Sequence, residues 1–321
     1  MEPRVSVIVP ARNEAATITA CVTSILAQEV EGGLEVLVVD GMSSDRTAQL
    51  AEAAGAVVVP NPDRLTPAAL NRGLEAARGD ILIRFDAHSE MPPGYIDQLV
   101  RALGEEVGAV NVGGWAEVRG SGPWSRAIAA ALRSPAGVGN SRLWRRPPPG
   151  TGRRDVETVP FGCFPADALR RAGGWREDLV RNQDFELNHR LRQAGGRIVF
   201  EPGVWFVYHP RESVTALAGQ YWGFGKYKAV TLAIAPESLK WRQLAPVGLL
   251  GLVALGAAPT RLAPAARTLL VGYAALVAVI AGRSDGGWRT APVLATIHLS
   301  WGAGLLSGLG RQVLGRVRQE R

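Results

Sequence analysis

The chain of 321 residues contains only two cysteines, Cys21 and Cys163, which excludes the small disulfide-stapled scaffolds of secreted proteins. We interpret both as buried thiols. The sequence also lacks the G-x-G-x-x-G of a dinucleotide-binding loop and the G-x-x-x-x-G-K-[ST] of a P-loop, which argues against a dehydrogenase and a P-loop kinase. No repeat of solenoid length occurs. The length suits a mid-sized catalytic domain with an appendage.

Acidic side chains are almost absent from the C-terminal part of the chain. From Lys240 onward there are 10 lysines and arginines against only Asp285 and Glu320, whereas the rest of the chain holds 26 basic and 27 acidic residues. The net charge of +7 therefore belongs to a part that is otherwise strongly apolar. Basic residues that flank apolar stretches are typical of membrane proteins, and no nucleic-acid partner is expected.

Three apolar stretches fill this C-terminal part, at 244–260, 268–282 and 291–310. Each is close to the roughly 17 to 25 residues that a tilted membrane span needs, although the middle one is short unless it begins near Leu262. A buried helical hairpin of a soluble domain is the alternative. Arginines at the boundaries and the absence of a polar helix face favour the membrane.

The predicted organisation is a cytoplasmic catalytic domain over 1–219, an interfacial aromatic and basic segment over 220–243, about three transmembrane helices over 244–310 and a basic tail over 311–321. Three spans would place the tail on the side opposite the catalytic domain, against the positive-inside tendency, so one stretch is a candidate for a re-entrant or interfacial segment. The N-terminal VSVIVP has no signal-peptide features, so we expect a multi-pass protein of the cell inner membrane with its catalytic domain in the cytoplasm.

Before the apolar part, short β-rich runs alternate with helical periodicity, which predicts an α/β fold with an all-parallel core buried on both faces. The expected strands are 4–10, 34–40, 57–59 and 81–86, and the expected helices are 17–28, 44–54 and 66–77. Between 133 and 154 the sequence is rich in Pro, Gly and Arg without a clear period. We interpret it as a mobile active-site loop, with a solvated linker as the alternative.

Polar residues follow three of the expected strands, where ligands gather in parallel sheets. Arg12, Asn13 and Glu14 follow the first, and Asp40 ends the second within VLVVDGMSSDRT. A strand-terminal acid before a tight turn suits recognition of a nucleotide's base and ribose, which makes Asp40 the candidate. Asp45 in the same turn is interpreted equally well as the cap of the next helix.

An Asp-x-His pair ends the fourth expected strand in ILIRFDAH. On an extended chain, Asp86 and His88 would lie on the same side two residues apart and could bind one divalent ion. An oxygen and a nitrogen ligand, completed by diphosphate oxygens, fit Mg²⁺ or Mn²⁺ better than a closed zinc site. The pair has an ordinary structural interpretation as well.

About a hundred residues later, Asp184 opens a predicted helix that ends at Gly195. A carboxylate at a helix start is usually a cap. The neighbouring VPFGCF and AGGWRED, with Gln183 and Glu186 beside Asp184, instead suggest the floor of a pocket. Both interpretations stay open on the local sequence alone.

Together the motifs resemble the inverting glycosyltransferases of family 2, which have the A-type nucleotide-diphospho-sugar transferase fold, a Rossmann-like, mostly parallel sheet. The resemblance covers 4–228. The matching motifs are VSVIVPARNE, VVDGMSSDRT, NPDRLTPAALNRGLEAARGD, FDAH in the place of the family's Asp-x-Asp, and NQDFELNHRLRQAG in the place of its Glu-Asp motif. The chain looks closest to the membrane-associated glucosyltransferases of succinoglycan-type exopolysaccharide assembly.

The resemblance implies a role for each matching residue. Asp184 would be the catalytic base, with Glu186 pointing elsewhere, and the metal ligands would be Asp86, His88 and, less directly, His209. Gly162, Cys163, Trp175 and Gln183 would bind the acceptor. The nucleotide would be bound by Pro10, Ala11, Arg12, Glu14, Asp40, Arg64, Asn71 and Asp86.

The resemblance further implies transfer of one sugar, glucose from UDP-glucose, onto a polyprenyl-diphosphate-linked saccharide, with Mg²⁺ or Mn²⁺ as cofactor and membrane lipids as partners. The sequence around Gln220 lacks the Gln-x-x-Arg-Trp signature of processive synthases. Two alternatives are a catalytically silent nucleotide-binding membrane scaffold, supported by His88 and Gln183, and a sugar-phosphate nucleotidyltransferase, for which VPARNE is the wrong N-terminal loop.

Overall fold

The computed structural model describes residues 4–139 and 142–319, and its internal contacts divide the chain into two units. Unit 1 comprises Met1–Glu117 and Arg142–Tyr208, and unit 2 comprises Val118–Ser141 and His209–Arg321. This division differs from the contiguous domain expected over 1–219, because an insertion after the sixth strand joins the C-terminal helices. The side chains of the expected basic tail from residue 313 onward lie outside the described residues.

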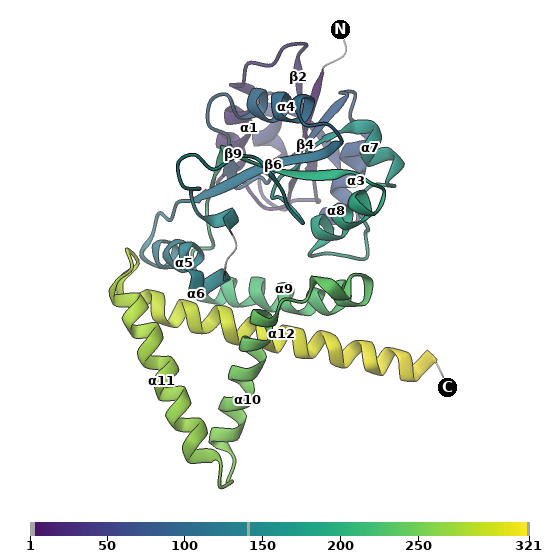
Figure 1. Ribbon diagram of the computed structural model, residues 1–321. Coiled ribbons are helices and arrows are strands. Elements are labelled where there is room, and N and C mark those ends of the chain that lie inside the picture. The colour runs from purple at the N-terminus through teal and green to yellow at the C-terminus, as the bar shows by residue number, and fades with distance from the viewer. Residues whose placement is uncertain (1–3, 140–141, 320–321) are drawn as a thin grey trace. The chain divides into compact units, whose positions relative to one another are not determined.

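Unit 1 is built on a nine-stranded sheet with helices beside it (Figure 1). The strand order is β3-β2-β1-β4-β8-β6-β9-β5, and β7 pairs with β9. The strands are β1 (Val5–Ala11), β2 (Leu34–Asp40), β3 (Val57–Pro60), β4 (Ile81–Arg84), β5 (Ser89–Glu90), β6 (Ala109–Val118), β7 (Arg154–Asp155), β8 (Cys163–Pro165) and β9 (Arg197–Tyr208). The helices are α1 (Ile18–Leu26), α2 (Thr47–Ala53), α3 (Thr66–Ala76), α4 (Tyr95–Glu105), α7 (Ala166–Arg171) and α8 (Gln183–Gln193), with the short helix η1 (Arg142–Trp144).

The predicted α/β class is confirmed, but the sheet is parallel only over its first four strands. Strand β8 pairs antiparallel with both β4 and β6, and β9 pairs antiparallel with β5 and β7. The expectation of an all-parallel core was therefore wrong for the second half of the sheet. Strand β8 has three residues, too few to show a period in the sequence.

Close packing of α3 on β1 forms the centre of the core of unit 1. All of β1 except Pro10 is buried, as expected for a strand covered on both faces. A Cβ atom on Gly73 would lie 2.3 Å from Cγ2 of Ile8, so glycine is what allows the helix to approach this strand. Both cysteines are buried free thiols, as predicted.

Unit 2 is helical, and α9 runs beside α12 (Figure 1). Its elements are α5 (Pro123–Arg133), α6 (Pro135–Val138), α9 (Val214–Ile234), η2 (Pro236–Ser238), η3 (Trp241–Leu244), α10 (Ala245–Ala257), α11 (Ala263–Gly282), η4 (Gly287–Arg289) and α12 (Thr290–Gln319). Part of the expected mobile loop is thus helical. In α6, Pro135 occupies the first helical position and the Ser134 hydroxyl accepts a hydrogen bond from the N–H of Ala136 at 3.2 Å.

Two helices are long and apolar enough to cross a membrane, at Ala263–Gly282 and Gly287–Gln312. Helix α10, in the first of the three expected spans, has only 13 residues. The middle span, expected to be short, is instead the 20-residue helix α11. Helix α11 exposes large apolar side chains such as Leu269 and Val271, at 58% and 69%. An exposed apolar surface of this kind on a long helix favours contact with lipid.

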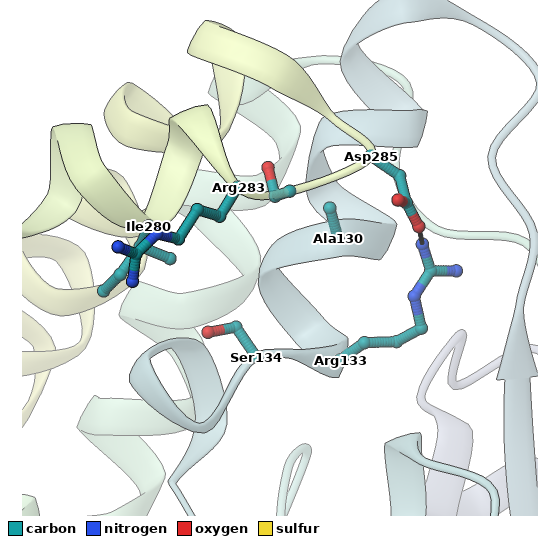
Figure 2. A pocket seen from close by; sticks show the side chains of 7 residues that line it. Ala130, Arg133, Ser134, Ile280, Arg283 and Asp285 are labelled. Carbon is teal, nitrogen blue, oxygen red and sulfur yellow. Dashed lines mark hydrogen bonds and ion pairs between the residues drawn. The ribbon is translucent and has the colours of Figure 1, made fainter.

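The turn after α11 borders a hollow of about 340 Å³ (Figure 2). Arg133 at the end of α5 contacts the Asp285 carboxylate of this turn at 3.3 Å and donates to the carbonyl of Val118 at 3.1 Å. Arg283 caps α11 from the other side of the hollow. Arginines at the C-terminal ends of helices are placed favourably against the helix dipole, so the hollow has an ordinary structural explanation.

Glycines permit the contact between α9 and α12. A Cβ atom on Gly225 would lie 2.1 Å from the carbonyl oxygen of Trp301, and one on Gly304 would lie 2.2 Å from that of Trp222. A backbone oxygen cannot rotate away as a flexible side chain can. The two helices can therefore approach this closely only with glycine at these positions.

We predict that Gly225→Ala destabilises the protein by about 1 to 3 kcal/mol, because the methyl group forces the two helices apart. Gly219→Ala is the matched control on the same helix, since nothing lies within 4 Å of its added Cβ. This control should be neutral or slightly stabilising because alanine favours the helix. Thermal unfolding of the detergent-solubilised protein measures both, and equal midpoints for the two variants would contradict the close packing.

Candidate active site

The register of the parallel strands brings the predicted polar residues to one edge of the sheet. Ala11 of β1 pairs with Asp40 of β2, and Ile8 of β1 pairs with Arg84 of β4. The N–H of Phe85 donates to the carbonyl of Ile8 at 2.9 Å. Because the three strands are parallel, the loops that follow them emerge side by side.

Hydrogen bonds join the loop after β1 to the loop after β2. Both carboxylate oxygens of Asp40 accept from Ser43, one from its N–H at 3.0 Å and one from its hydroxyl. The Ser43 hydroxyl in turn accepts from the N–H of Asn13 at 2.9 Å. Asp45 accepts from Ala15 N–H and from Thr47 N–H. The cap position of α2 is Arg46 and not Asp45, so the capping interpretation was wrong in its residue; Asp45 precedes the cap and joins the first loop to the start of α2.

The other predicted nucleotide-binding residues lie around these loops with different exposure. Pro10 and Ala11 end β1, Arg12 is exposed in the loop that follows, and Glu14 is half-buried with its N–H donating to the Thr47 hydroxyl at 2.8 Å. Arg64 is exposed in the loop between β3 and α3, where its φ of 59° lies in the left-handed region. Their roles in nucleotide binding stay predictions.

The Asp-x-His pair lies in a turn and not on an extended chain, which corrects the sequence interpretation. Strand β4 ends at Arg84, and the N–H of Ser89 donates to the carbonyl of Asp86 at 3.0 Å. The Asp86 side chain is 21% exposed and the His88 side chain 23%. Nδ1 of His88 lies 3.5 Å from Oε1 of Glu14. The turn therefore holds the imidazole next to the first loop.

His209, the third predicted metal ligand, belongs to unit 2. It follows directly in the sequence after Tyr208, the last residue of β9 and of unit 1. Within unit 1, Tyr208 pairs with Ser89 and its ring meets the His88 ring edge-on at 5.5 Å. The role of His209 stays a prediction.

Asp184 lies in the first turn of α8, with both carboxylate oxygens hydrogen-bonded. Oδ1 accepts from the indole Nε1 of Trp175 at 3.1 Å, and Oδ2 accepts from Nη1 of Arg84. The side chain is 28% exposed. Burial raises the pKa of Asp184, and the negative charge of Asp86 raises it further, while the Arg84 guanidinium opposes both effects. A partly exposed carboxylate with a raised pKa is suited to accept a proton.

Arg84 is the residue of the site that sequence reasoning missed. Its Nη2 donates to Oδ1 of Asp86 at 2.7 Å while Nη1 donates to Asp184, so one guanidinium joins a carboxylate two residues away to one 100 residues away. Burial alone would lower the pKa of Arg84, but the two carboxylates outweigh it and the pKa is raised. The available signal was a single charged residue inside the apolar run ILIRF.

Asn71 holds the backbone of Trp175 in place. Its Nδ2 donates to the Trp175 carbonyl at 2.8 Å, and its Oδ1 accepts from the Trp175 N–H, also at 2.8 Å. Gly174, with a φ of 68°, permits this approach, since a Cβ there would lie 2.5 Å from Oδ1 of Asn71. Asn71 therefore orients the indole that meets Asp184, and its predicted place beside the donor's diphosphate or ribose stays a prediction.

The remaining predicted acceptor residues form part of the frame around Arg84 and Asp184. Gly162 accepts a hydrogen bond from the N–H of Arg84 at 3.1 Å, and Cys163 of β8 is fully buried. Gln183 is a buried first residue of α8. Glu186 pairs with Arg190 at 2.7 Å and so points away from Asp184, in agreement with the sequence expectation.

The residues around Asp86 suit a cation shared with a substrate more than a site built by protein alone. Within 4–139 and 142–319, no group of three His, Cys, Asp or Glu side chains is placed to hold a metal ion. Asp86 and His88 offer one oxygen and one nitrogen ligand on partly exposed side chains. Magnesium-type sites commonly use one or two protein ligands and complete the shell with substrate phosphates, so the residues present fit such an ion.

Comparison with known proteins decides the family. The profile described as glycosyl transferase family 2 matches residues 6–173, which include Asp40, Arg84 and Asp86. The chain belongs to glycosyl transferase family 2. The match covers more than half of the chain and all the parallel strands of the sheet.

Two curated relatives cover nearly the whole chain. The succinoglycan biosynthesis protein ExoA of Rhizobium meliloti is 29% identical over 93% of this chain and 92% of its own length. An undecaprenyl-phosphate 4-deoxy-4-formamido-L-arabinose transferase of Pseudomonas fluorescens is 28% identical over 98% of this chain and 85% of its own. The resemblance to family 2 transferases of the succinoglycan type is thereby confirmed.

A solved structure shows the same fold. The mannosyltransferase PcManGT from Pyrobaculum calidifontis, in complex with GDP-Man and Mn²⁺, superposes with a TM-score of 0.68 at 21% identity, over 97% of this chain and 88% of its own. The predicted A-type fold, followed by C-terminal apolar helices, is therefore confirmed.

We predict that Asn71→Ala lowers the stability of the protein by about 1 to 3 kcal/mol, because it leaves the N–H and C=O of Trp175 without their partners. The control is Arg72→Ala on the same helix, which removes an exposed ion pair with Asp63 and should leave the unfolding midpoint nearly unchanged. Urea unfolding of the solubilised protein measures both variants. A midpoint for Asn71→Ala equal to that of the control would show that the two hydrogen bonds contribute nothing.

Proposed function

We propose that the chain is an inverting glycosyltransferase that transfers one sugar from a nucleotide-diphospho-sugar to a polyprenyl-linked saccharide in the synthesis of a cell-surface glycan. The observation that carries this proposal is the pairing of Asp184 and Asp86 through Arg84 at the carboxyl edge of the sheet. A carboxylate that can act as base thus lies next to a carboxylate that can face the donor.

In this proposal, Asp184 accepts the proton of the acceptor hydroxyl as its oxygen forms a bond to the anomeric carbon. The bond from that carbon to the nucleoside diphosphate breaks on the opposite face, and the electron pair leaves with the diphosphate, so the configuration inverts. The Trp175 N–H and the Arg84 guanidinium orient the carboxylate, because each binds one of its oxygens. Glu186 is tied to Arg190 and cannot serve as a second nucleophile.

Donor recognition is assigned to the two joined loops. The Asp40 carboxylate at the end of β2 is held by Ser43, close to Ala11 and the exposed Arg12, which suits contacts with a nucleotide base. Asp86 and His88 would hold a divalent ion, either Mg²⁺ or Mn²⁺. Such an ion, when bound, offsets the negative charge that develops on the leaving diphosphate. For the donor we propose UDP-glucose, with glucose as the sugar that is transferred.

The acceptor and the location are inferred from the relatives and from unit 2. Two relatives are named for transfer to polyprenyl phosphates, an undecaprenyl phosphate in one and a dolichyl phosphate sugar in the other. A lipid-linked acceptor needs an enzyme at the membrane, and helix α11 supplies an exposed apolar surface of suitable length. We therefore place the protein in the bacterial inner membrane, as a multi-pass protein with its catalytic domain in the cytoplasm.

The first test measures transfer into lipid. Membranes that contain the expressed protein are incubated with radiolabelled nucleotide sugars, a divalent cation and lipid extract from the native host, and the organic phase is counted. Label from one donor that is abolished by EDTA and reduced at least about 1,000-fold by Asp184→Asn would support the proposal.

Asp178→Asn is the matched control, because Asp178 is an exposed carboxylate that pairs with the neighbouring Arg176. It should transfer at the wild-type rate. Full activity of Asp184→Asn would refute the assigned base. Tight UDP binding with no label from any donor would instead favour the silent scaffold.

The raised pKa of Asp184 predicts the pH dependence of the reaction. The base acts only when deprotonated, so the rate falls as pH drops through the pKa, and the acid limb should lie above the usual range of aspartate. Trp175→Phe removes an N–H that stabilises the ionised form, and should move this limb to higher pH. Trp115→Phe removes a different indole N–H, which donates to the carbonyl of Pro202. It should leave the acid limb at the pH of the wild type. A kcat/KM profile against pH checks all three.

A further inference from the structure

Arg84 is a buried cation whose charge is divided between two carboxylates. Its side chain is 10% exposed, and its two terminal nitrogens contact different acids, Nη1 the carboxylate of Asp184 and Nη2 that of Asp86. Its Nε is buried without a partner in the described part of the chain. Neither acid therefore holds the guanidinium through the two parallel hydrogen bonds that make arginine–carboxylate pairs strongest.

Asp86 is consequently shared before any cation arrives. One of its oxygens accepts from Arg84 at 2.7 Å, and that fixed positive charge repels a second cation bound at the same carboxylate. The other predicted ligand, the His88 imidazole, carries no negative charge that could offset this repulsion. On the side of the first loop, the Glu14 carboxylate lies 3.5 Å from His88.

Asp184 depends on the same guanidinium for its orientation. It leaves α8 from the first turn and reaches β4 through Arg84, while Trp175 binds its other oxygen. The guanidinium carbon of Arg84 lies 5.4 Å from the centre of the Phe161 ring, in cation–π contact. Loss of the hydrogen bond to Asp86 would leave the guanidinium free to rest wholly on Asp184.

We propose that Arg84 is a positioning residue that couples the two halves of the site, because its guanidinium competes with a divalent cation for Asp86 while it orients the base Asp184. This inference rests on the proposed function, in which Asp86 is a metal ligand. It predicts effects of opposite sign when the charge is removed. Cation binding becomes tighter and turnover becomes slower.

The direct test is a Mn²⁺ titration of the full-length protein in detergent, with free Mn²⁺ measured by electron paramagnetic resonance. Arg84→Gln removes the competing charge and should bind Mn²⁺ about 10-fold more tightly than the wild type. Its kcat should fall about 100-fold, because the base is no longer oriented. A residue with a merely structural role would not tighten cation binding when it is replaced.

Arg84→Lys separates charge from geometry and keeps the test decisive if the glutamine variant fails to fold. Lysine retains the positive charge, so Mn²⁺ affinity should stay within about threefold of the wild type. An ammonium cannot reproduce the planar fork that spans both acids, so kcat should still fall about 10-fold or more. Equal losses of Mn²⁺ affinity and kcat in this variant would overturn the coupling.

Two controls distinguish failure of the coupling from failure of the proposed function. Arg78→Gln breaks another arginine–carboxylate pair of unit 1, that with Glu35, and should leave Mn²⁺ affinity unchanged. Asp86→Asn should weaken Mn²⁺ binding about 10-fold or more. No weakening in Asp86→Asn would remove the metal role of Asp86 and the inference with it. Normal weakening there, together with unchanged affinity in Arg84→Gln, would overturn the coupling alone.

Discussion

The pairing of β1 with a parallel strand on each side is the interaction on which unit 1 depends. It sets Ala11 beside Asp40 and Ile8 beside Arg84, so that one register fixes both the nucleotide-facing loops and the start of the Asp86 turn. Since β1 is buried on both faces, its own contribution to the site begins only where the strand ends. The apolar centre of the sheet and its polar edge therefore have one cause.

The change of strand direction at β8 brings in the second half of the site. Beside β4, β8 runs antiparallel and places Gly162 next to the backbone of Arg84. A Cβ atom on Gly162 would lie 2.1 Å from Oδ1 of the buried Asn111, so a larger residue there would force the Asn111 side chain to shift. The chain that continues from β8 then carries Trp175 and Asp184 back toward β4, which explains how residues a hundred positions apart share one guanidinium.

The sequence predicted the parallel half of the fold well, because four apolar runs bounded by turn residues mark β1 to β4 and amphipathic periodicity marks α1 to α3. Strands β5 and β8 have two and three residues and depend on partners far along the chain, so no local pattern could reveal them. At the site, motif resemblance singled out Asp86 and Asp184. It could not find Arg84, whose importance lies in a contact between distant segments. It also could not find the two hydrogen bonds that join Asn71 to the backbone of Trp175.

The helices of unit 2 change the number of expected membrane spans. Three spans would have placed the basic tail on the side opposite the catalytic domain, against the positive-inside tendency. Helices α10 and α11 form a hairpin (Figure 1), and Arg267 near its tip donates to the carbonyl of Gly256 at 2.8 Å. Arginine is costly inside a bilayer, so in the proposed membrane insertion this tip belongs at a headgroup layer. Helix α11, at about 30 Å, matches the hydrocarbon thickness. Helix α10, with 13 residues, is too short to cross, so the two candidate spans are Ala263–Gly282 and Gly287–Gln312, and an even number of crossings returns the chain to the face that it left. In the proposed insertion, the basic sequence over 311–321 then lies on the cytoplasmic side, and it no longer conflicts with the positive-inside tendency.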